Sequence, residues 1–423
     1  MPGGPPPKAG TVAPSPHPAK PEFHRPRAWR PGWIHGKPGP SDMLSDVAHQ
    51  PGDRLQLAVE SLAYGGDGVA RTEGFVVFIP FTAPGDRIEA ELVEVKKHFA
   101  RARLIQVLDP SPDRVNPACS LFGECGGCQY QHLRYDAQLR LKQRQVTELL
   151  DRLGGFHDAP IDPVVPCPVP YGYRNRIMVR SQWDKPNQRL VVGFIRADNR
   201  LVVDVPSCPI AEPALNEQLT QVRAHPPPKG GIKVTLRLAP DGWEVPPDSF
   251  FQNNFHLLPN LVETVRQRLR AAGIRYLIDA YCGVGFFALE CAGVVERFTG
   301  VEIDKSAIKA ARRNLELRGA TNGDFIAGPA EEWIPALLQR FPPDHTAVII
   351  DPPRVGCAPP FLRALRETLP AQVIYVSCHP ATLARDLKLL CADGCYRLEQ
   401  VTPLDMFPQT QHVECIASLR RGA

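Results

Sequence analysis

From about residue 275 onward, short apolar runs alternate with amphipathic segments. RYLIDA, RFTGVE, HTAVIID and AQVIYVS are typical of buried strands. The segment DKSAIKAARRNLELRG is typical of a helix, with Asp304 at its N-terminal cap and Gly319 beyond its end. Strands that alternate with helices predict a doubly wound, Rossmann-like α/β sheet, whose ligands bind at the carboxyl ends of the strands.

The chain between residues 50 and 109 has the shorter period of strands. Apolar or alternating runs are separated by turns such as YGGDG; they are RLQLAVESL, GFVVFIPF, DRIEAELVEVKKHF and RARLIQVL. Such short strands in about sixty residues predict a small β-barrel of the oligonucleotide-binding type. One turn gathers cations around Phe99: Lys96, Lys97, His98, Arg101 and Arg103. This mixture suits phosphate and base contacts, although an ordinary solvated hairpin tip is the alternative.

These changes of pattern predict a multidomain α/β protein with four parts. Residues 1–48 form a basic, proline-rich arm without regular structure, and residues 49–109 form the barrel. Residues 110–248 form a central β-rich domain with a helix near 131–153, and residues 249–423 form the α/β domain.

Composition excludes several classes of protein. The 423 residues are 43% hydrophobic and 22% charged, enough for two or three packed domains. No apolar run is long enough to span a membrane, and an apolar secretory signal is absent from the N-terminus. We therefore expect a cytoplasmic protein, monomeric and without a protein partner. In that compartment the twelve cysteines are expected to be free thiols, metal ligands or catalytic groups.

Three cysteines share one short glycine-rich loop, CSLFGECGGC. Cys119, Cys125 and Cys128 stand at a C-x5-C-x2-C spacing, which suits one metal centre that still needs a fourth ligand. Cys208, in the loop PSCPI, is the better candidate, and Cys167 in PCPVP is its competitor. Four thiolates suit structural zinc or an iron–sulfur cluster, and the single CxxC pair favours the cluster.

A glycine turn follows the first strand of the α/β part. Gly283, Gly285 and Ala288 satisfy G-x-G-x-x-A, and Glu302 ends the next strand, where it could accept hydrogen bonds from a ribose. This pattern fits a nicotinamide dinucleotide as well as S-adenosylmethionine. A tight turn that serves only helix packing is the third interpretation.

The next strand ends place reactive side chains at the same edge. DPPRVG holds Asp351 and Arg354 on a loop stiffened by two prolines. VSCHPATLARD puts Cys378 at a strand end, where a nucleophile would face the cofactor, and DMFPQTQHVE brings His412 and Glu414 into the last strand region.

Together these motifs resemble the RNA uracil-5 (5-methyluridine) methyltransferase family, in particular its cluster-bearing 23S rRNA branch, the RumA type. The resemblance runs from about residue 50 to the C-terminus and includes SCPI, FFQNN, DAYCGVG, VEID and YVSCHPATLARD. YGGDGVAR followed by FIPFTAPGDRIEAEL is similar to a TRAM domain, a small RNA-binding barrel.

The resemblance implies roles for individual residues. It implies Cys378 as the nucleophile and Glu414 as the base, with a 4Fe–4S cluster on Cys119, Cys125, Cys128 and Cys208. It places S-adenosylmethionine among Gln252, Tyr281, Gly283, Gly285, Glu302 and Asp351. The implied partner is RNA, with ribosomal RNA as the first expectation and transfer RNA as the second.

The chain departs from the family pattern at three positions. His379 replaces the asparagine of a Ser-Cys-Asn-Pro motif, Phe286 stands where a polar residue often follows the second glycine, and Pro329 stands where a polar residue would meet the adenine. Arg174, Asn175 and Arg176 are candidates for RNA phosphate contacts, or for bracing a domain interface. A nicotinamide-dependent oxidoreductase and a non-catalytic iron–sulfur RNA-binding protein are the competing hypotheses.

Overall fold

A computed structural model describes residues 49–72, 75–198, 200–225, 233–238 and 240–422. The predicted basic arm lies outside these residues. Among the helices described, none is both long and apolar enough to cross a membrane.

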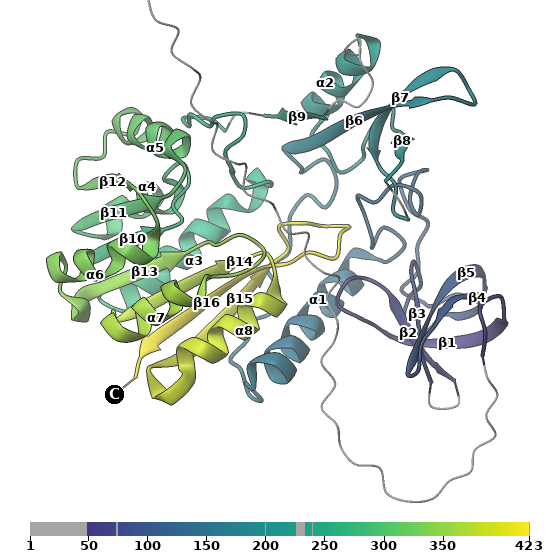
Figure 1. Ribbon diagram of the computed structural model, residues 1–423, viewed down its shortest axis with the longest axis horizontal. Coiled ribbons are helices and arrows are strands. Elements are labelled where there is room, and N and C mark those ends of the chain that lie inside the picture. The colour runs from purple at the N-terminus through teal and green to yellow at the C-terminus, as the bar shows by residue number, and fades with distance from the viewer. Residues whose placement is uncertain (1–48, 73–74, 199, 226–232, 239, 423) are drawn as a thin grey trace, which may run out of the picture. The chain divides into compact units, whose positions relative to one another are not determined.

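The first sheet is a closed barrel, as the strand pattern predicts (Figure 1). Its strands follow the order β1-β2-β3-β5-β4 around the barrel. Their bounds are β1 Arg54–Leu62, β2 Gly68–Thr72, β3 Phe75–Ile79, β4 Arg87–Val95 and β5 Phe99–Asp109. Alternate residues such as Leu57, Val77 and Ile88 fill the interior, because successive side chains of a strand point to opposite faces. The three register shifts between β4 and β5 let these strands curve enough to close the barrel.

The central part combines a helix with a small antiparallel sheet. Helix α1 (Tyr135–Leu149) continues into a π-helical turn, η1 (Leu150–Gly154), and Gly155 ends it in the left-handed conformation. The sheet has the order β8-β7-β6-β9 and is covered by α2 (Pro213–Ala224). Its strands are β6 Arg176–Asp184, β7 Arg189–Ile195, β8 Val202–Asp204 and β9 Lys233–Arg237.

The C-terminal part is a seven-stranded sheet of order β12-β11-β10-β13-β14-β16-β15. Five strands are parallel, and β15 and β16 add an antiparallel edge. The strands are β10 Tyr276–Ala280, β11 Arg297–Glu302, β12 Gly323–Ala327, β13 Thr346–Ile350, β14 Gln372–Ser377, β15 Tyr396–Leu404 and β16 Glu414–Arg421. Every residue of β13 and β14 is buried, as expected for central parallel strands covered on both faces.

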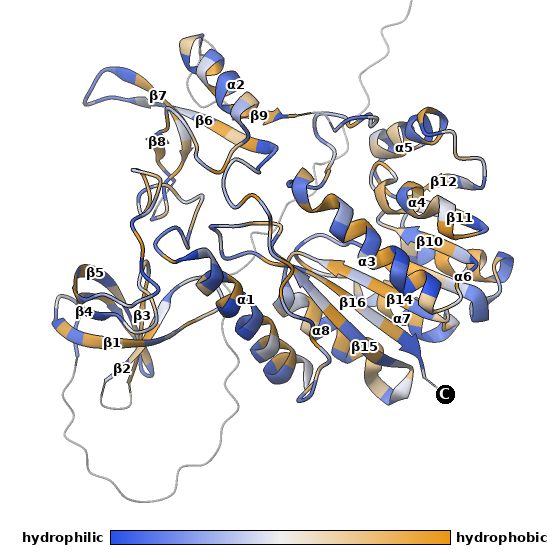
Figure 2. Ribbon diagram, turned by 180° about the vertical axis from the view of Figure 1, so that it is seen from behind, coloured by the Kyte–Doolittle hydropathy of each residue, from blue (hydrophilic) through white to orange (hydrophobic). Residues whose placement is uncertain are grey.

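Helices cover both faces of this sheet. Helices α3, α4 and α5 pack into one apolar cluster, and α6, α7 and α8, joined by α1, pack into the other. Figure 2 shows the apolar strands between the helices. The helices are α3 Leu258–Ala271, α4 Phe286–Cys291, α5 Lys305–Leu317, α6 Ala330–Arg340, α7 Pro359–Thr368 and α8 Pro380–Cys391. Short 3-10 turns are η2 Phe255–Leu257, η3 Ala292–Val294, η4 Pro343–His345 and η5 Ala392–Gly394.

The strand order reverses between β10 and β13, which makes the carboxyl ends of these strands the expected ligand site. The glycine turn follows β10, the DPPR loop follows β13, and Cys378 follows β14. The fold therefore brings the predicted motifs to one edge of one sheet.

Candidate active site

The turn after β10 has the geometry that its glycines require. Gly283 and Gly285 have positive φ angles of 53° and 88°, and a Cβ on Gly285 would lie 2.6 Å from the Phe325 ring. Tyr281 also has a positive φ, 65°, which is uncommon for a residue with a side chain. Glu302 accepts a hydrogen bond from the Gly283 amide at 3.1 Å, so the acidic residue lies directly against the turn.

Sequence reasoning did not single out Asp279, a residue of β10 that is hydrogen-bonded to the helix after this turn. Its buried carboxylate accepts a hydrogen bond from the Ala288 amide at 2.8 Å, and burial raises its pKa to about 8. The interaction fixes the start of α4 against β10. An acidic residue two positions before the turn, inside an apolar strand, was the available signal.

The DPPR loop contacts two polar side chains, Gln252 and His412, at the carboxyl end of β13. Gln252 donates a hydrogen bond to the Asp351 carboxylate at 3.2 Å. The Arg354 guanidinium lies 3.1 Å from Nε2 of His412 on the loop before β16. Burial, together with the charge of Arg354, lowers the pKa of His412 to about 3, so this histidine is neutral. Gln252, Asp351 and Arg354 therefore lie around one edge of the sheet.

Cys378 and Glu414 lie side by side across two neighbouring strands. The β14/β16 register ends with Ser377 paired to Cys415, and Cys378 and Glu414 are the next residues outward on the two segments. The Glu414 charge acts directly on the Cys378 thiol, which agrees with this placement. The pKa of the Cys378 thiol is raised to about 12, chiefly by burial and also by the Glu414 charge, while the Arg354 guanidinium opposes both. Two of the predicted residues are thus adjacent and electrostatically coupled.

Glu414 and Asp351 form a second coupled pair. Both carboxyl groups have raised pKa values, chiefly because they are buried, and in Glu414 the negative charge of Asp351 adds to the effect. Arg354 opposes the rise in Glu414. A positive charge entering this site would favour the ionised carboxylates.

His379 performs the task that asparagine commonly performs at a helix start. Its Nδ1 accepts a hydrogen bond from the Thr382 amide at 3.3 Å, which caps α8. Because Nδ1 accepts, the neutral ring carries its proton on Nε2. The other departures also have structural explanations: Phe286 packs against Trp243 and Phe251, and Pro329 is the N-cap residue of α6.

The loop between β15 and β16, residues 405–413, is anchored to the central part of the chain. The Gln409 carbonyl accepts hydrogen bonds from the Gln129 and Tyr130 amides at 3.1 and 2.9 Å, next to Cys128. The Gln138 side chain of α1 donates to the Gln409 side-chain oxygen at 2.9 Å and accepts from the Gln409 backbone amide at 3.0 Å. Gln409 has a positive φ of 68°, and the hydrogen bonds of its backbone and side chain hold it in this conformation.

A buried ion pair anchors the start of the same loop. Lys142 of α1 donates to Asp405 at 2.5 Å and to the Phe407 carbonyl at 3.1 Å, and both charged side chains are 0% exposed. Sequence analysis missed this pair. The available signal was the inward spacing of polar residues along α1: Gln138, Lys142 and Gln145.

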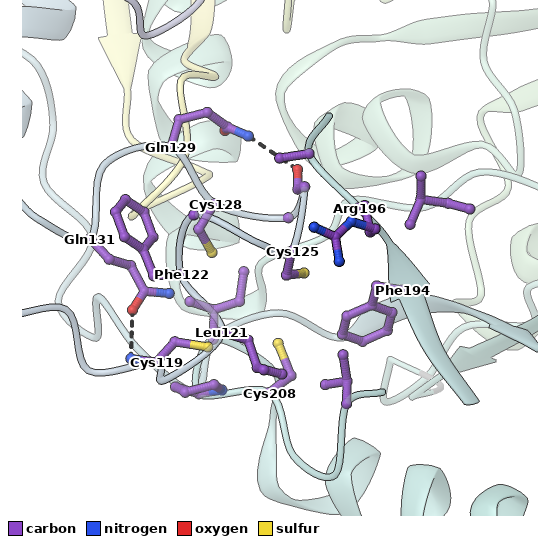
Figure 3. Close-up of a pocket in the computed structure, with 18 of the residues that line it drawn as sticks. Cys119, Leu121, Phe122, Cys125, Cys128, Gln129, Gln131, Phe194, Arg196 and Cys208 are labelled. Atoms are coloured by element: carbon purple, nitrogen blue, oxygen red, sulfur yellow. Dashed lines mark hydrogen bonds between the residues drawn. The ribbon is translucent and has the colours of Figure 1, made fainter. Parts of the chain in front are cut away.

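The four predicted ligand cysteines line a single cavity of about 600 Å³. Figure 3 shows the sulfur atoms of Cys119, Cys125, Cys128 and Cys208 turned toward the same space. All four are free thiols. The pKa of Cys128 is raised to about 12, chiefly by burial, and the neighbouring Cys208 contributes to the rise. Four cysteine side chains around one space have the donor chemistry of an iron–sulfur centre.

The cysteine loop is held by neighbouring backbone. The Gly126 amide donates to the Ile195 carbonyl at 3.0 Å, and the Ala197 amide donates to the Glu124 carbonyl at 2.8 Å. Within the described ranges, no group of three or more His, Cys, Asp or Glu side chains is arranged to hold a single metal ion.

Cys167 lies elsewhere. Its thiol is buried in the core, where Asn254 donates to it at 3.3 Å, and its amide donates to the Tyr135 hydroxyl at 2.7 Å. It does not line the cavity of the other four cysteines. Of the two candidates for a fourth ligand, Cys208 therefore lies with the three cysteines of the loop and Cys167 does not.

Two sets of predicted RNA-binding residues differ in their surroundings. In the barrel, Lys97 is exposed, whereas Lys96 and Arg101 share Glu94. Asn175 is buried, and its side-chain amide donates to the Gln252 carbonyl at 3.0 Å. Asn175 therefore connects the central part of the chain to the segment around Gln252, which agrees with the second role considered for it, bracing a domain interface.

Family models match two parts of the chain. The model of the tRNA (Uracil-5-)-methyltransferase family matches residues 241–422, and the model of the TRAM domain matches residues 49–105. An RNA methyltransferase from Synechocystis sp., itself uncharacterized, is 32% identical, and the alignment covers 88% of this chain and 96% of the relative.

Two relatives carry names that include a substrate. The tRNA (uracil(54)-C(5))-methyltransferase of Schizosaccharomyces pombe is 31% identical, over 90% of this chain and 80% of the relative. The crystal structure of Pyrococcus abyssi tRNA (uracil-54, C5)-methyltransferase with S-adenosyl-L-homocysteine has a TM-score of 0.65 and 26% identity, over 86% of this chain and 100% of that one. With its N-terminal barrel and Rossmann-like sheet, the chain belongs to the tRNA (uracil-5-)-methyltransferase family of RNA methyltransferases with a TRAM domain.

Proposed function

We propose that this protein methylates C5 of a uridine in structured RNA through a covalent bond between Cys378 and C6 of the base. The observation that carries the proposal is the adjacency of Cys378 and Glu414 at the carboxyl edge of the sheet, beside the glycine turn. S-adenosylmethionine, the methyl donor, would lie among Gln252, Tyr281, Gly283, Gly285, Glu302 and Asp351. When bound, it supplies an electrophilic methyl group and a positive sulfonium charge.

The residues suit the problem that uracil poses. C5 of uracil is a weak nucleophile, and thiolate addition at C6 moves electron density through C5 onto the C4 carbonyl oxygen. The S–C6 bond would form first, and C5 would then take the methyl group, while the broken sulfur–methyl bond of the donor would leave S-adenosylhomocysteine. Glu414 removes the C5 proton, the electrons of that C–H bond restore the C5–C6 double bond, and Cys378 leaves as a thiolate.

The electrostatics of the site favour this order of events. The thiol of Cys378 has a raised pKa in the protein alone, and only Arg354 among its nearest charges opposes the rise. A sulfonium beside it would stabilise the thiolate at the moment when it is needed. The raised pKa of Glu414 makes it a stronger base once it is ionised. To reach Cys378, the uridine must leave its stack, at a cost of a few kcal/mol.

We assign a 4Fe–4S cluster to Cys119, Cys125, Cys128 and Cys208. Its support is the shared cavity and the four free thiols. The reaction above transfers no electron, so the cluster would have a structural and RNA-docking role. The resemblance of the cysteine loop also supports 23S ribosomal RNA as the substrate.

Transfer RNA is the second candidate, and the names of two relatives favour it. The nicotinamide hypothesis does not explain the nucleophile and base, and a non-catalytic RNA-binding protein would leave Cys378 without a task.

The test is to map 5-methyluridine in 23S rRNA and tRNA from cells with the gene, without it, and with a Cys378→Ala copy. We expect one or more 23S rRNA sites to lose the methyl group without the gene and to stay unmethylated with Cys378→Ala. Loss confined to tRNA would overturn the ribosomal assignment. Unchanged 5-methyluridine in both RNAs would overturn the proposed activity.

A further inference from the structure

The turn that joins β1 to β2 of the barrel is fastened to α1 and to the segment before it. Gln145 of α1 donates to the Ala63 carbonyl at 3.1 Å, and the Ala63 amide donates to the Asp67 carbonyl at 2.8 Å. Gly66 has a φ of 96°, and a Cβ there would lie 3.3 Å from the Tyr130 ring. The turn therefore has one defined position, and a side chain on it can be placed accurately.

Tyr64 projects from this turn to the residue beside the nucleophile. Its ring meets the His379 ring edge-on, with centroids 5.5 Å apart and planes at 90°. His379 directly follows Cys378 and is itself fixed by its capping bond to Thr382. A residue of the RNA-binding barrel thus reaches the catalytic edge of a sheet that begins more than 200 residues later in the chain.

The Tyr64 hydroxyl is a hydrogen-bond donor in this site. Burial raises the pKa of Tyr64 above its ordinary value, and the charge on Cys378 raises it further, while Arg354 opposes them. The phenol therefore keeps its proton at neutral and alkaline pH. Across the part of the chain that the structure describes, no hydrogen-bond partner is recorded for this hydroxyl. It is available to a bound molecule.

We propose that Tyr64 contacts the target uridine and that its hydroxyl donates a hydrogen bond to a carbonyl oxygen of the uracil ring. This inference rests on the proposed function, because it requires a uridine with C6 at Cys378. Enzymes that extract a base read it through hydrogen bonds to its polar edge and through aromatic contacts. Uracil offers two carbonyl oxygens, and addition at C6 increases the negative charge on one of them. The neutral Tyr64 hydroxyl can donate a hydrogen bond to the oxygen that gains this charge.

The consequence is that the barrel completes the active site as well as holding RNA. The simpler explanation is that Tyr64 only supports the ring of His379. The two explanations differ in one atom, since phenylalanine keeps the edge-on contact and loses only the hydroxyl.

The test compares full-length wild type, Tyr64→Phe and a control, Tyr276→Phe. Tyr276 stacks on Phe341 with centroids 5.2 Å apart and begins β10, at the end of the sheet opposite the site. Two rates are measured: methylation of the RNA that wild type accepts, as kcat/KM, and S-adenosylmethionine-dependent covalent trapping on the same RNA carrying 5-fluorouridine. We expect Tyr64→Phe to slow both about tenfold, the loss of one hydrogen bond of about 1.4 kcal/mol. S-adenosylhomocysteine affinity, RNA affinity and the control should stay within about twofold of wild type.

Wild-type rates in Tyr64→Phe would overturn the inference. Slow methylation by Tyr64→Phe together with loss of RNA and S-adenosylhomocysteine affinity would also overturn it, because that pattern is expected of a structural residue. A wild type that forms no adduct with 5-fluorouridine RNA would instead overturn the proposed function. The two failures are therefore distinguishable.

Discussion

Replacing Lys142 by methionine is expected to destabilise the protein and to loosen the loop that leads to Glu414. Methionine is close to lysine in length and fills the same space, so the change removes a charge more than it removes packing. Asp405 would be left as a carboxylate with 0% exposure and without its ammonium partner. The loop would also lose the hydrogen bond to the Phe407 carbonyl.

The magnitude follows from the burial of both partners. Burial lowers the pKa of Lys142, and the Asp405 charge opposes this change. Each of the two buried charges is therefore stabilised by the other. Removing one member of a fully buried pair costs about 3–5 kcal/mol. The double variant Lys142→Met/Asp405→Asn should be less destabilised than Lys142→Met alone, because it leaves no unpaired charge. Lys388→Met, at an exposed position of α8, should change stability by less than about 0.5 kcal/mol.

Equilibrium urea denaturation measures the free energy of unfolding, and amide hydrogen exchange reports on residues 405–413 separately. We expect Lys142→Met to speed exchange in this loop, to leave the barrel unchanged and to slow methylation. A loss below about 1 kcal/mol, or a double variant whose loss equals the sum of the two single losses, would refute the reasoning.

Three further outcomes are expected. Cys208→Ser should lose the iron of purified protein, about four atoms per chain, while Cys167→Ser keeps it; the reverse result would make the ligand assignment wrong. Reversing Lys96 and Lys97 to glutamate should weaken RNA binding and flatten its salt dependence without changing S-adenosylmethionine affinity, whereas unchanged RNA affinity would mark the turn as merely solvated. The rate of Cys378 alkylation by iodoacetamide in cofactor-free protein should rise about tenfold per pH unit from pH 7 to 10, because the thiolate fraction grows tenfold per unit below a pKa of about 12. A rate that reaches a plateau near pH 8 would contradict this.

The sequence predicted what depends on local pattern. The carboxyl ends of β10, β13 and β14 each carry a motif directly after an apolar run, and parallel strands must bring such ends to one edge. Cys378, Asp351 and the glycine turn could therefore be placed together before any coordinates. The barrel followed in the same way from its alternating strands and turns.

What escaped prediction depends on contacts between distant parts of the chain. Lys142 and Asp405 are 263 positions apart, and neither has a local pattern that points to the other. Tyr64 reads as an ordinary turn residue until the fold brings it to His379. His379 itself looked like a departure from the family motif, and only its bond to Thr382 shows that a ring nitrogen can cap α8. Side-chain partners of this kind are set by tertiary packing.

The most direct test of the central claim is a denaturing gel of the Glu414→Gln protein incubated with substrate RNA, with and without S-adenosylmethionine. If Cys378 adds first and Glu414 acts only after methyl transfer, this variant stops with the C5 proton in place and elimination blocked. We expect a slower-migrating protein–RNA species that requires S-adenosylmethionine, is attached at Cys378 by peptide mass spectrometry, and is absent from the matched Cys378→Ala/Glu414→Gln double variant. Release of 5-methyluridine at the wild-type rate, or attachment at another cysteine such as Cys357 or Cys282, would contradict the account.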